Sequence, residues 1–373
     1  MQITDYNNNK NTKFPKPCAC CGEGIISEPH DICPVCGWED DPVQNEDHDF
    51  AGGANRLSLN AYRQVCIDMD NIRSVSVLEI TAAVRDMCIE ANMQLSQDMC
   101  AALKNAAEKE TGELGRNILG QLDENLKIAG EEQIPICQDT GMAVVFMDIG
   151  QDVHFTGGEL RDAVNEGVRR GYEEGYLRKS VVRDPLERIN TGDNTPAVLH
   201  CRIVPGDRVT ITVAPKGFGS ENMSRVFMLK PADGEEGVKN AVITAVREAG
   251  ANACPPMVVG VGVGGDFEQA AMMAKHALTG RLNSVQVHSI GNDSSPAEDS
   301  ALPSSRSGSE TLWARIQAEL FTALNKLNIG PGGMGGSNTV LGVNIETYPT
   351  HIAGLPVAVN ICCHVNRHVT WVI

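Results

Sequence analysis

The stretch Glu132-Gln133-Ile134-Pro135-Ile136-Cys137-Gln138-Asp139-Thr140-Gly141-Met142-Ala143-Val144 lies where a helical pattern gives way to a strand pattern, and it holds a cysteine beside a carboxylate. Two distant cysteines have equally unusual neighbours, because Cys254 precedes Pro255-Pro256 and Cys363 precedes His364. Three thiolates that folding gathers in space can hold an iron–sulfur cube and leave one iron without a protein ligand. Such an iron acts as a Lewis acid, although the spacing alone does not establish the cluster. Electron-transfer ferredoxins keep their cysteines a few residues apart, whereas these three are more than a hundred residues apart.

Length and composition restrict the class of protein. The chain has 373 residues, 42% of them hydrophobic, which is enough for one large or two modest domains with a real core. No apolar run approaches the ~20 residues that span a membrane, and the first residues lack the features of a secretory signal. The net charge of −17 disfavours nucleic acid and anionic membranes as partners. Thirteen cysteines without a secretory signal indicate a reducing cytoplasm.

The first segment, residues 1–69, has the pattern of a separate cysteine-rich module. Cys18-x-x-Cys21 and Cys33-x-x-Cys36 supply four thiolates, the tetrahedral set that zinc prefers. Whether Cys20 or Cys21 takes part stays open at this point, and reduced cysteines without a metal are the alternative. A segment this short has too little core to fold well unaided, which favours the metal.

The same segment has matches to a known family. The stretches concerned are Pro17-Cys18-Ala19-Cys20-Cys21-Gly22, Ile32-Cys33-Pro34-Val35-Cys36 and Trp38-Glu39-Asp40-Asp41-Pro42-Val43-Gln44. They resemble the small cysteine-rich CPCC family, although Ala19 stands where that family has proline. The resemblance implies an accessory module and no particular activity.

Residues 72–373 alternate between helical and strand patterns, and we interpret them as one main domain. A helix is predicted from Ser76, whose spacing to Glu79 is that of a capping box. Strands are predicted over 143–149, 197–204, 208–214 and 257–263, with a turn at Pro205-Gly206-Asp207. The predicted fold class is α+β, a helix-rich main domain with a mainly antiparallel sheet. Residues 285–309, rich in Ser, Pro and Asp, are interpreted as an exposed insertion or linker.

Several side chains of the main domain could carry chemistry, and each has an ordinary structural alternative. Asp139 could take or relay a proton, or simply form a turn. Arg178 could clamp a carboxylate with two hydrogen bonds, or be a solvated surface arginine. His351 could be a ligand, an acid–base group or a buried structural histidine. The glycine-rich loop Lys216 to Ser220 could present backbone N–H groups to an anion.

Five stretches of the main domain are long enough to compare with known families. They are the Cys137 stretch quoted above, Leu177-Arg178-Lys179-Ser180-Val181-Val182, Ala214-Pro215-Lys216-Gly217-Phe218-Gly219-Ser220-Glu221-Asn222-Met223, Ala253-Cys254-Pro255-Pro256, and Glu346-Thr347-Tyr348-Pro349-Thr350-His351-Ile352-Ala353-Gly354-Leu355-Pro356-Val357. In these stretches the chain closely resembles the α subunit of two-subunit class I, or iron–sulfur, fumarate hydratases. The α subunit of L(+)-tartrate dehydratase is similar. The resemblance covers nearly all of 77–373 except the predicted insertion.

This resemblance implies a set of site residues. The ligands of a [4Fe–4S] cluster with one open iron would be Cys137, Cys254 and Cys363. The catalytic residues would be Asp139 and His351, and the residues that bind the substrate would be Gln138, Arg178, Gly217 and Gly219. Phe218 replaces a glycine of the family's loop, which adds bulk near the expected substrate.

The resemblance also implies a reaction and a partner. The reaction would be the reversible dehydration of (S)-malate to fumarate, with the open iron as Lewis acid. A separate β subunit would complete the active site, in a heterotetramer, so we expect the chain alone to be inactive. The substrate would be a small dicarboxylate, and neither nucleic acid nor membrane would be a partner.

Three questions stay open from the sequence. L(+)-tartrate dehydratase, which forms oxaloacetate, is the first alternative, because the two substrates differ by one hydroxyl group. The second alternative is a zinc-binding interaction protein whose fumarase-like part is a degenerate scaffold. The third cluster ligand is also open, because Cys362 stands beside Cys363 where the family commonly has Asn. We choose Cys363, since it keeps the twelve-residue distance from His351.

Overall fold

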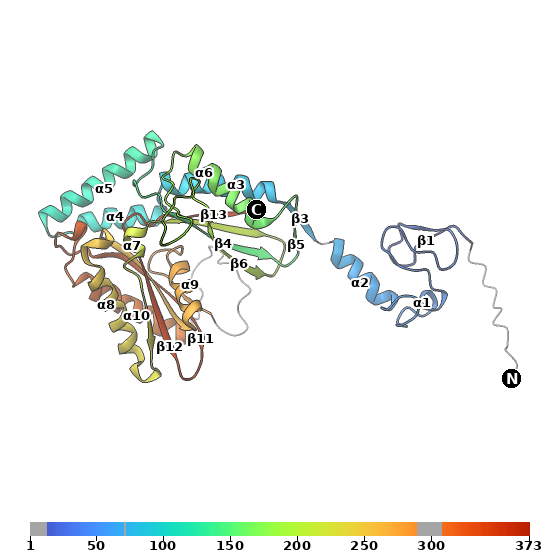
Figure 1. The fold of residues 1–373 in the computed structure, drawn as a ribbon. Coiled ribbons are helices and arrows are strands. Elements are labelled where there is room, and N and C mark those ends of the chain that lie inside the picture. Colours follow the sequence, from blue (N-terminus) through green and yellow to red (C-terminus); the bar gives the residue numbers. More distant parts are fainter. Residues whose placement is uncertain (1–12, 71, 289–307) are drawn as a thin grey trace. The chain divides into compact units, whose positions relative to one another are not determined.

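The computed structural model describes residues 13–70, 72–288 and 308–373 (Figure 1). The chain divides into two compact units, the first ending at Arg73 and the second running from Ser74 to Ile373. Each has a hydrophobic core of its own, and we call them the N-terminal unit and the main unit. None of the described helices combines the length and the apolar character that crossing a bilayer requires.

The N-terminal unit has little regular structure. Its elements are β1 (Lys16–Pro17), β2 (Ile25–Ile26), α1 (Pro42–Glu46) and α2 (Leu59–Asp70), and β1 pairs antiparallel with β2. Its buried core consists of three larger apolar side chains and two cysteines, namely Ile26, Trp38, Leu59, Cys18 and Cys33. A core of this size gives only limited stability by itself.

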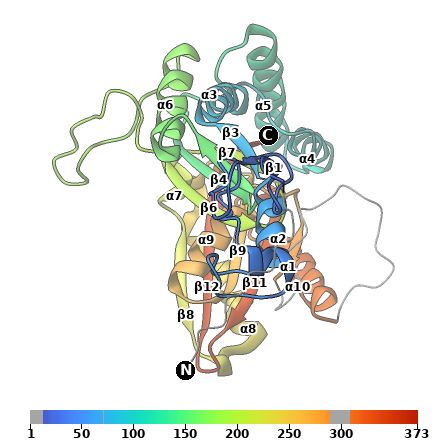
Figure 2. The ribbon, with the colours of Figure 1, turned by 90° about the vertical axis from the view of Figure 1, so that its right-hand side faces the viewer.

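A four-stranded sheet forms one half of the main unit. In spatial order its strands are β13 (Val369–Val372), β7 (Val209–Lys216), β4 (Met142–Gly150) and β6 (Val198–Val204). Two helices, α3 (Val77–Met93) and α6 (Leu160–Glu174), share its apolar core and lie side by side (Figure 2). They approach closely, because a Cβ at Gly167 of α6 would lie only 2.7 Å from the carbonyl oxygen of Thr81 of α3. The short strands β3 (Arg73–Ser76) and β5 (Val153–Thr156) form a separate pair.

The two strands predicted on either side of Pro205-Gly206-Asp207 are present, but they do not pair with each other. β4 lies between them, so that Val144 faces Val198 of the parallel strand β6 and Ala214 of the antiparallel strand β7. The turn residues determine only that the chain reverses its direction. The pairing of β6 and β7 with β4 joins segments more than forty residues apart, and it buries β4 between two neighbouring strands.

A five-stranded sheet forms the other half of the main unit. In spatial order its strands are β10 (Val285–Val287), β11 (Val340–Thr350), β9 (Met257–Gly265), β12 (Leu355–Cys362) and β8 (Arg225–Leu229). The first three run parallel, and β12 runs antiparallel to both β9 and β8. Its main core lies against α8 (Gly234–Ala249) and α10 (Gly308–Asn325), and α9 (Phe267–Ala277) packs on the opposite face.

The glycine run in β9 is explained by this packing. Val259, Val261 and Val263 point into the core under α8 and α10. Gly260 and Gly262 point the other way, where a Cβ at either position would lie 2.1 Å from a backbone carbonyl oxygen of α9. The glycines therefore permit a close approach between α9 and the sheet.

The remaining elements connect these layers. They are α4 (Gln97–Lys109), α5 (Glu113–Glu132), the one-turn helix α7 (Phe218–Glu221), and the 3₁₀ turns η1 (Pro231–Asp233), η2 (Gly250–Ala253) and η3 (Pro331–Gly333). The predicted loop Lys216 to Ser220 is thus the end of β7 followed by most of α7.

The predicted α+β class is confirmed, and both larger sheets are mixed. The five-stranded sheet has two parallel and two antiparallel pairings, and the four-stranded sheet has two antiparallel pairings and one parallel pairing. The predicted insertion at 285–309 lies mostly outside the described residues. Its first three residues are not loop, because they form β10 at the edge of the sheet, and its last two begin α10. A three-residue edge strand carries too short an alternation to be recognised in a polar stretch.

Candidate active site

Cys137 lies between α5 and β4, on a segment held by backbone contacts. The N–H group of Ile136 donates to the carbonyl oxygen of Asn92 at 2.9 Å, and the carbonyl oxygen of Ile136 accepts from the side chain of Asn125 at 2.9 Å. Ile136 is buried in a small apolar cluster, against which Cys137 and Cys363 both pack. The structure therefore brings these two cysteines to one place, although 226 positions separate them in the sequence.

Cys254 joins the same neighbourhood through its backbone. Its carbonyl oxygen accepts hydrogen bonds from the backbone N–H of His364 at 3.4 Å and from Nδ1 of His364 at 3.0 Å, which sets it beside Cys363. It follows η2 in a left-handed conformation (φ 51°, ψ 63°) and is exposed. Although the residue is exposed overall, neighbouring atoms remove part of the water around its thiol. This partial desolvation raises the pKa of Cys254, and the nearby charges of Cys137 and Asp139 raise it further. All three predicted cluster cysteines are thus neighbours, and none is in a disulfide.

Asp139 is held from two sides. One carboxylate oxygen accepts from the N–H of Gly141 at 3.1 Å, and the other accepts from the N–H of Phe218 at 3.1 Å. Its backbone carbonyl accepts from the guanidinium of Arg367, which also donates to the carbonyl oxygen of Pro215 at 3.2 Å. These bonds fix the carboxylate between the Cys137 segment and the end of β7.

Gly217 is a position where a side chain does not fit. A Cβ there would lie 2.9 Å from the nearer carboxylate oxygen of Asp139. Gly219 has open space around it, and Gln138 is exposed next to Asp139. The predicted substrate-binding residues Gln138, Gly217 and Gly219 therefore all lie around this carboxylate.

Arg178 is anchored beside the same segment through its main chain. Its N–H donates to the hydroxyl oxygen of Thr140 at 2.9 Å, and its carbonyl accepts from that hydroxyl at 3.1 Å. Tyr172 of α6 donates its hydroxyl to the carbonyl oxygen of Thr140 at 2.8 Å, which holds α6 against this turn. The Arg178 residue is exposed.

His351 is not part of this group in a single chain. It lies in the turn after β11, where Gly265 ends β9, whereas Cys254 precedes β9 and Cys363 follows β12 at the opposite end of the sheet. Each strand residue advances about 3.3 Å, so the nine residues of β9 separate these ends by roughly 25 Å. This separation could not be predicted from the sequence, in which His351 and Cys363 are only twelve residues apart.

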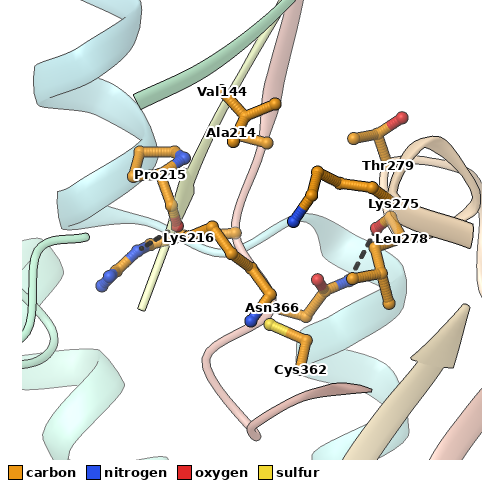
Figure 3. A pocket seen from close by; sticks show the side chains of 10 residues that line it. Val144, Ala214, Pro215, Lys216, Lys275, Leu278, Thr279, Cys362 and Asn366 are labelled. Atoms are coloured by element: carbon orange, nitrogen blue, oxygen red, sulfur yellow. Dashed lines mark hydrogen bonds between the residues drawn. The ribbon is translucent and has the colours of Figure 1, made fainter. Parts of the chain in front are cut away.

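A pocket beside the site contains charged residues that sequence reasoning did not single out. Figure 3 shows Lys216, Lys275 and Cys362 around this pocket, which Asn366 and Arg367 also line. Lys216 Nζ lies 3.3 Å from a carboxylate oxygen of Glu221, and Lys275 of α9 contacts the other oxygen. Burial alone would raise the pKa of Glu221, but the two lysines outweigh burial and hold it below its usual value.

Cys362 and Cys363 face different surroundings. Cys362 is buried, lines the lysine-containing pocket, and packs with apolar side chains of α4 and α5. Interaction with the adjacent thiol of Cys363, helped by the charges of Lys216 and Arg367, holds the pKa of the Cys362 thiol below its usual value. Only Cys363 packs against the apolar cluster that Cys137 contacts.

The four cysteines predicted to bind zinc come together in the N-terminal unit. Cys18 Sγ lies 3.6 Å from Cys36 Sγ, and Cys21 Sγ lies 3.7 Å from Cys33 Sγ. All four sulfurs are within 4.8 Å of one another. The group could therefore hold a single metal ion.

Comparison with known families agrees with this arrangement. Residues 81–372 match the model of the family described as Fumarate hydratase (Fumerase), and residues 16–75 match Cysteine-rich CPCC. The chain belongs to the fumarate hydratase family. Its N-terminal unit corresponds to the CPCC type, and the family and its relatives make the chain a hydro-lyase.

Curated relatives of the chain are named as tartrate dehydratase subunits. A protein of Methanocaldococcus jannaschii named "Putative L(+)-tartrate dehydratase subunit alpha" is 38% identical over 296 residues, which cover 78% of this chain and 96% of that protein. The L(+)-tartrate dehydratase subunit alpha of Escherichia coli (strain UTI89 / UPEC) is 29% identical over 299 residues, covering 79% of this chain and 91% of that protein.

Proposed function

We propose that this chain is the α-type subunit of an iron–sulfur hydro-lyase that removes water from a small hydroxy-dicarboxylate. The observation that carries the proposal is the convergence of Cys137, Cys254 and Cys363 beside a carboxylate that two backbone N–H groups hold in place. A carboxylate fixed by backbone N–H groups next to free thiols is typical of a functional site.

The donor set fits a [4Fe–4S] cluster. Three thiolates from three segments are soft ligands of the kind that iron–sulfur clusters take. The four N-terminal cysteines have sulfurs within 4.8 Å of one another, but these three cysteines form no such tight group among the described residues. Their wider spacing suits ligands of different iron atoms. Arg367 Nη1 is buried without a hydrogen-bond partner among the described residues, so it can donate to a bound group. When bound, such a cluster supplies a Lewis acid that makes a hydroxyl a better leaving group.

The chain's own residues would bind and orient the substrate around this cluster. Arg178 would pair with a substrate carboxylate, and Gln138 and the backbone at Gly217 and Gly219 would hold its oxygens. Asp139 would accept or relay the proton removed from carbon. Its orientation by Gly141 and Phe218 leaves little freedom for the carboxylate to turn away.

L(+)-tartrate is the substrate that the comparisons favour over the expected (S)-malate, because the relatives are named for tartrate. Dehydration of tartrate would give oxaloacetate, and dehydration of malate would give fumarate. The test is to co-express the chain with a β subunit, reconstitute the cluster without oxygen, and compare kcat/KM for the two substrates. We expect a higher kcat/KM for L(+)-tartrate. A higher value for malate would return the assignment to fumarase, and turnover of neither would overturn the proposed activity.

A β subunit is the proposed partner, because the relatives are named as alpha subunits. We propose a heterotetramer in the cytoplasm, and thirteen free cysteines support a reducing compartment. The Arg178 and Gln138 side chains are exposed beside the thiols, so a second subunit could cover them and exclude water from the site.

For residues 1–69 we propose a structural zinc site. Cys18, Cys21, Cys33 and Cys36 supply the tetrahedral thiolate set, and metal binding would supply folding free energy that the small core lacks. The degenerate-scaffold alternative predicts zinc without iron in the purified chain. We expect both metals, with iron and sulfide in the main unit.

A further inference from the structure

The two cysteine pairs of the N-terminal unit are built alike. In each, a glycine follows the second cysteine, and both glycines, Gly22 and Gly37, have a φ of 76°. The N–H of Gly22 donates to the carbonyl of Cys18 at 3.0 Å, and the N–H of Gly37 donates to the carbonyl of Cys33 at 2.9 Å. We call them the first knuckle (residues 18–22) and the second knuckle (residues 33–37).

This likeness decides which cysteine of the first knuckle faces the metal group. Cys21 matches Cys36, since each directly precedes the glycine. Cys20 then matches Val35, whose side chain is 59% exposed and takes no part in the group of four. Cys20 is therefore a fifth thiol, which lies beside the group of four and is not a member of it.

Helix α2 brings a sixth thiol to Cys20. Cys66 Sγ of α2 lies 3.7 Å from Cys20 Sγ, and both residues are half-buried. Two other residues of α2 fix the helix in this position. Tyr62 donates its hydroxyl to the carbonyl oxygen of Cys36 at 2.9 Å, and Arg63 donates to the carbonyl oxygen of Ala19 at 2.6 Å. The contact between the two sulfurs therefore follows from the docking of α2 on both knuckles.

A second metal ion is not the better reading of this pair. Cys20 and Cys66 lie within 4.8 Å of only one further ligand in the described part of the chain, Cys36. Cys36 already belongs to the group of four, so the pair supplies two thiols of its own where zinc takes four ligands. Two thiols in contact, without a metal to bind, are a dithiol.

We propose that Cys20 and Cys66 form a reversible disulfide that fastens α2 to the first knuckle beside the zinc site. The oxidant would be a small-molecule disulfide. One thiolate of the pair attacks a sulfur of that oxidant, forms a mixed disulfide and releases one thiolate. The second cysteine of the pair then attacks the protein sulfur and releases the other thiolate. The two protein thiols lose two electrons and two protons, and the oxidant becomes two thiols.

The inference concerns a modification site, and it rests on the proposed zinc site only for the assignment of Cys36. The full-length, zinc-loaded chain is treated with oxidised glutathione, its free thiols are alkylated, and the digested peptides are analysed by mass spectrometry together with the zinc content. We expect a peptide that links Cys20 to Cys66, with a mass about 2 Da below the sum of the two reduced peptides, and dithiothreitol should reverse the link. The zinc content should be about one per chain before and after oxidation.

Three variants make the result specific. Cys20→Ser and Cys66→Ser should each abolish the linked peptide and keep the zinc. Cys201→Ser, which removes an exposed thiol of the main unit, should leave both unchanged. Recovery of Cys20 and Cys66 as free or separately modified thiols would overturn the proposal, and so would a second zinc per chain that Cys20→Ser removes. A Cys20–Cys66 link in a chain that never binds zinc would overturn the zinc site and support the disulfide.

Discussion

Cys362 and Cys363 are adjacent, yet their surroundings give them different chemistry. Cys362 ends β12 inside the pocket with Lys216, and the charges there favour its thiolate. Cys363 is the first residue beyond the strand and packs with Cys137. The chain leaves the strand between these two residues, and this change of direction decides which sulfur reaches the neighbourhood of Cys137.

The choice between these two cysteines can be tested directly. We expect Cys363→Ser to lose most of its iron and acid-labile sulfide after anaerobic reconstitution, because a cluster ligand is removed. Cys362→Ser is the matched control and should keep both. The measurement is iron and sulfide per chain, and retention by the first variant with loss by the second would make Cys362 the ligand.

Among the elements, Glu110 at the end of α4 has a structural role that its sequence position does not suggest. It is 2% exposed and accepts from the N–H groups of Gly112, Ser337 and Asn338, and from the side chain of Asn338 at 2.8 Å. It thereby joins the turn before α5 to the glycine-rich loop that contains η3. Burial alone would raise the pKa of Glu110, but these hydrogen bonds outweigh it and hold the pKa below its ordinary value of 4.5.

We expect Glu110→Gln to lower the free energy of unfolding by about 1–3 kcal/mol, because an amide in place of the carboxylate leaves buried donors without an acceptor. Urea denaturation near neutral pH is the measurement, with the exposed Glu131→Gln as a control of little effect. A carboxylate with a lowered pKa stabilises the fold above pH 4.5, and that contribution is lost as the pH falls through the folded-state pKa. The difference between the two proteins should therefore shrink in acid, and a constant difference would contradict this account.

The same elements show how far sequence reasoning reaches. The helix start at Ser76 was predictable, because its hydroxyl caps α3 through a local hydrogen bond to the N–H of Leu78. The order of β6, β4 and β7 was not, because strand pairing across distant segments leaves no local trace. The cysteines and Asp139 were predicted from residue type and family resemblance, and the structure brings them together. Lys275 and Arg367 were missed, because their positions depend on the packing of α9 and of the chain after β12.

At the scale of the whole molecule, His351 raises a question of assembly. The roughly 25 Å along β9 prevents it from reaching the thiols of its own chain without unfolding the sheet. If His351 acts on the substrate, as the family resemblance implies, it must act in the site of another copy. A heterotetramer contains two copies of this chain, which makes such an exchange possible.

Mixing two inactive variants tests this exchange. His351→Ala and Cys137→Ser chains, each co-expressed with the β subunit, should be inactive alone. Random mixing puts one chain of each variant into about half of the pairs. Each such pair has one intact site of two, so we expect about a quarter of the normal activity to return. A mixture of Cys137→Ser with Cys254→Ser should recover none, because each chain then lacks a cysteine of its own cluster and both sites of every pair are damaged. Full activity of the His351→Ala protein would show that this histidine has no catalytic role.

The face of β9 that carries Gly260 and Gly262 links the packing of α9 to the charges in the pocket. Gly260 and Gly262 let α9 rest directly on the strand, and α9 carries Lys275 into the charged pocket while β9 begins just after Cys254. Any residue larger than glycine would act as a spacer and lift the helix, and the lysine would move away with it. A substitution that alters the packing of β9 against α9 would therefore also alter the electrostatic potential in the pocket that Lys275 lines.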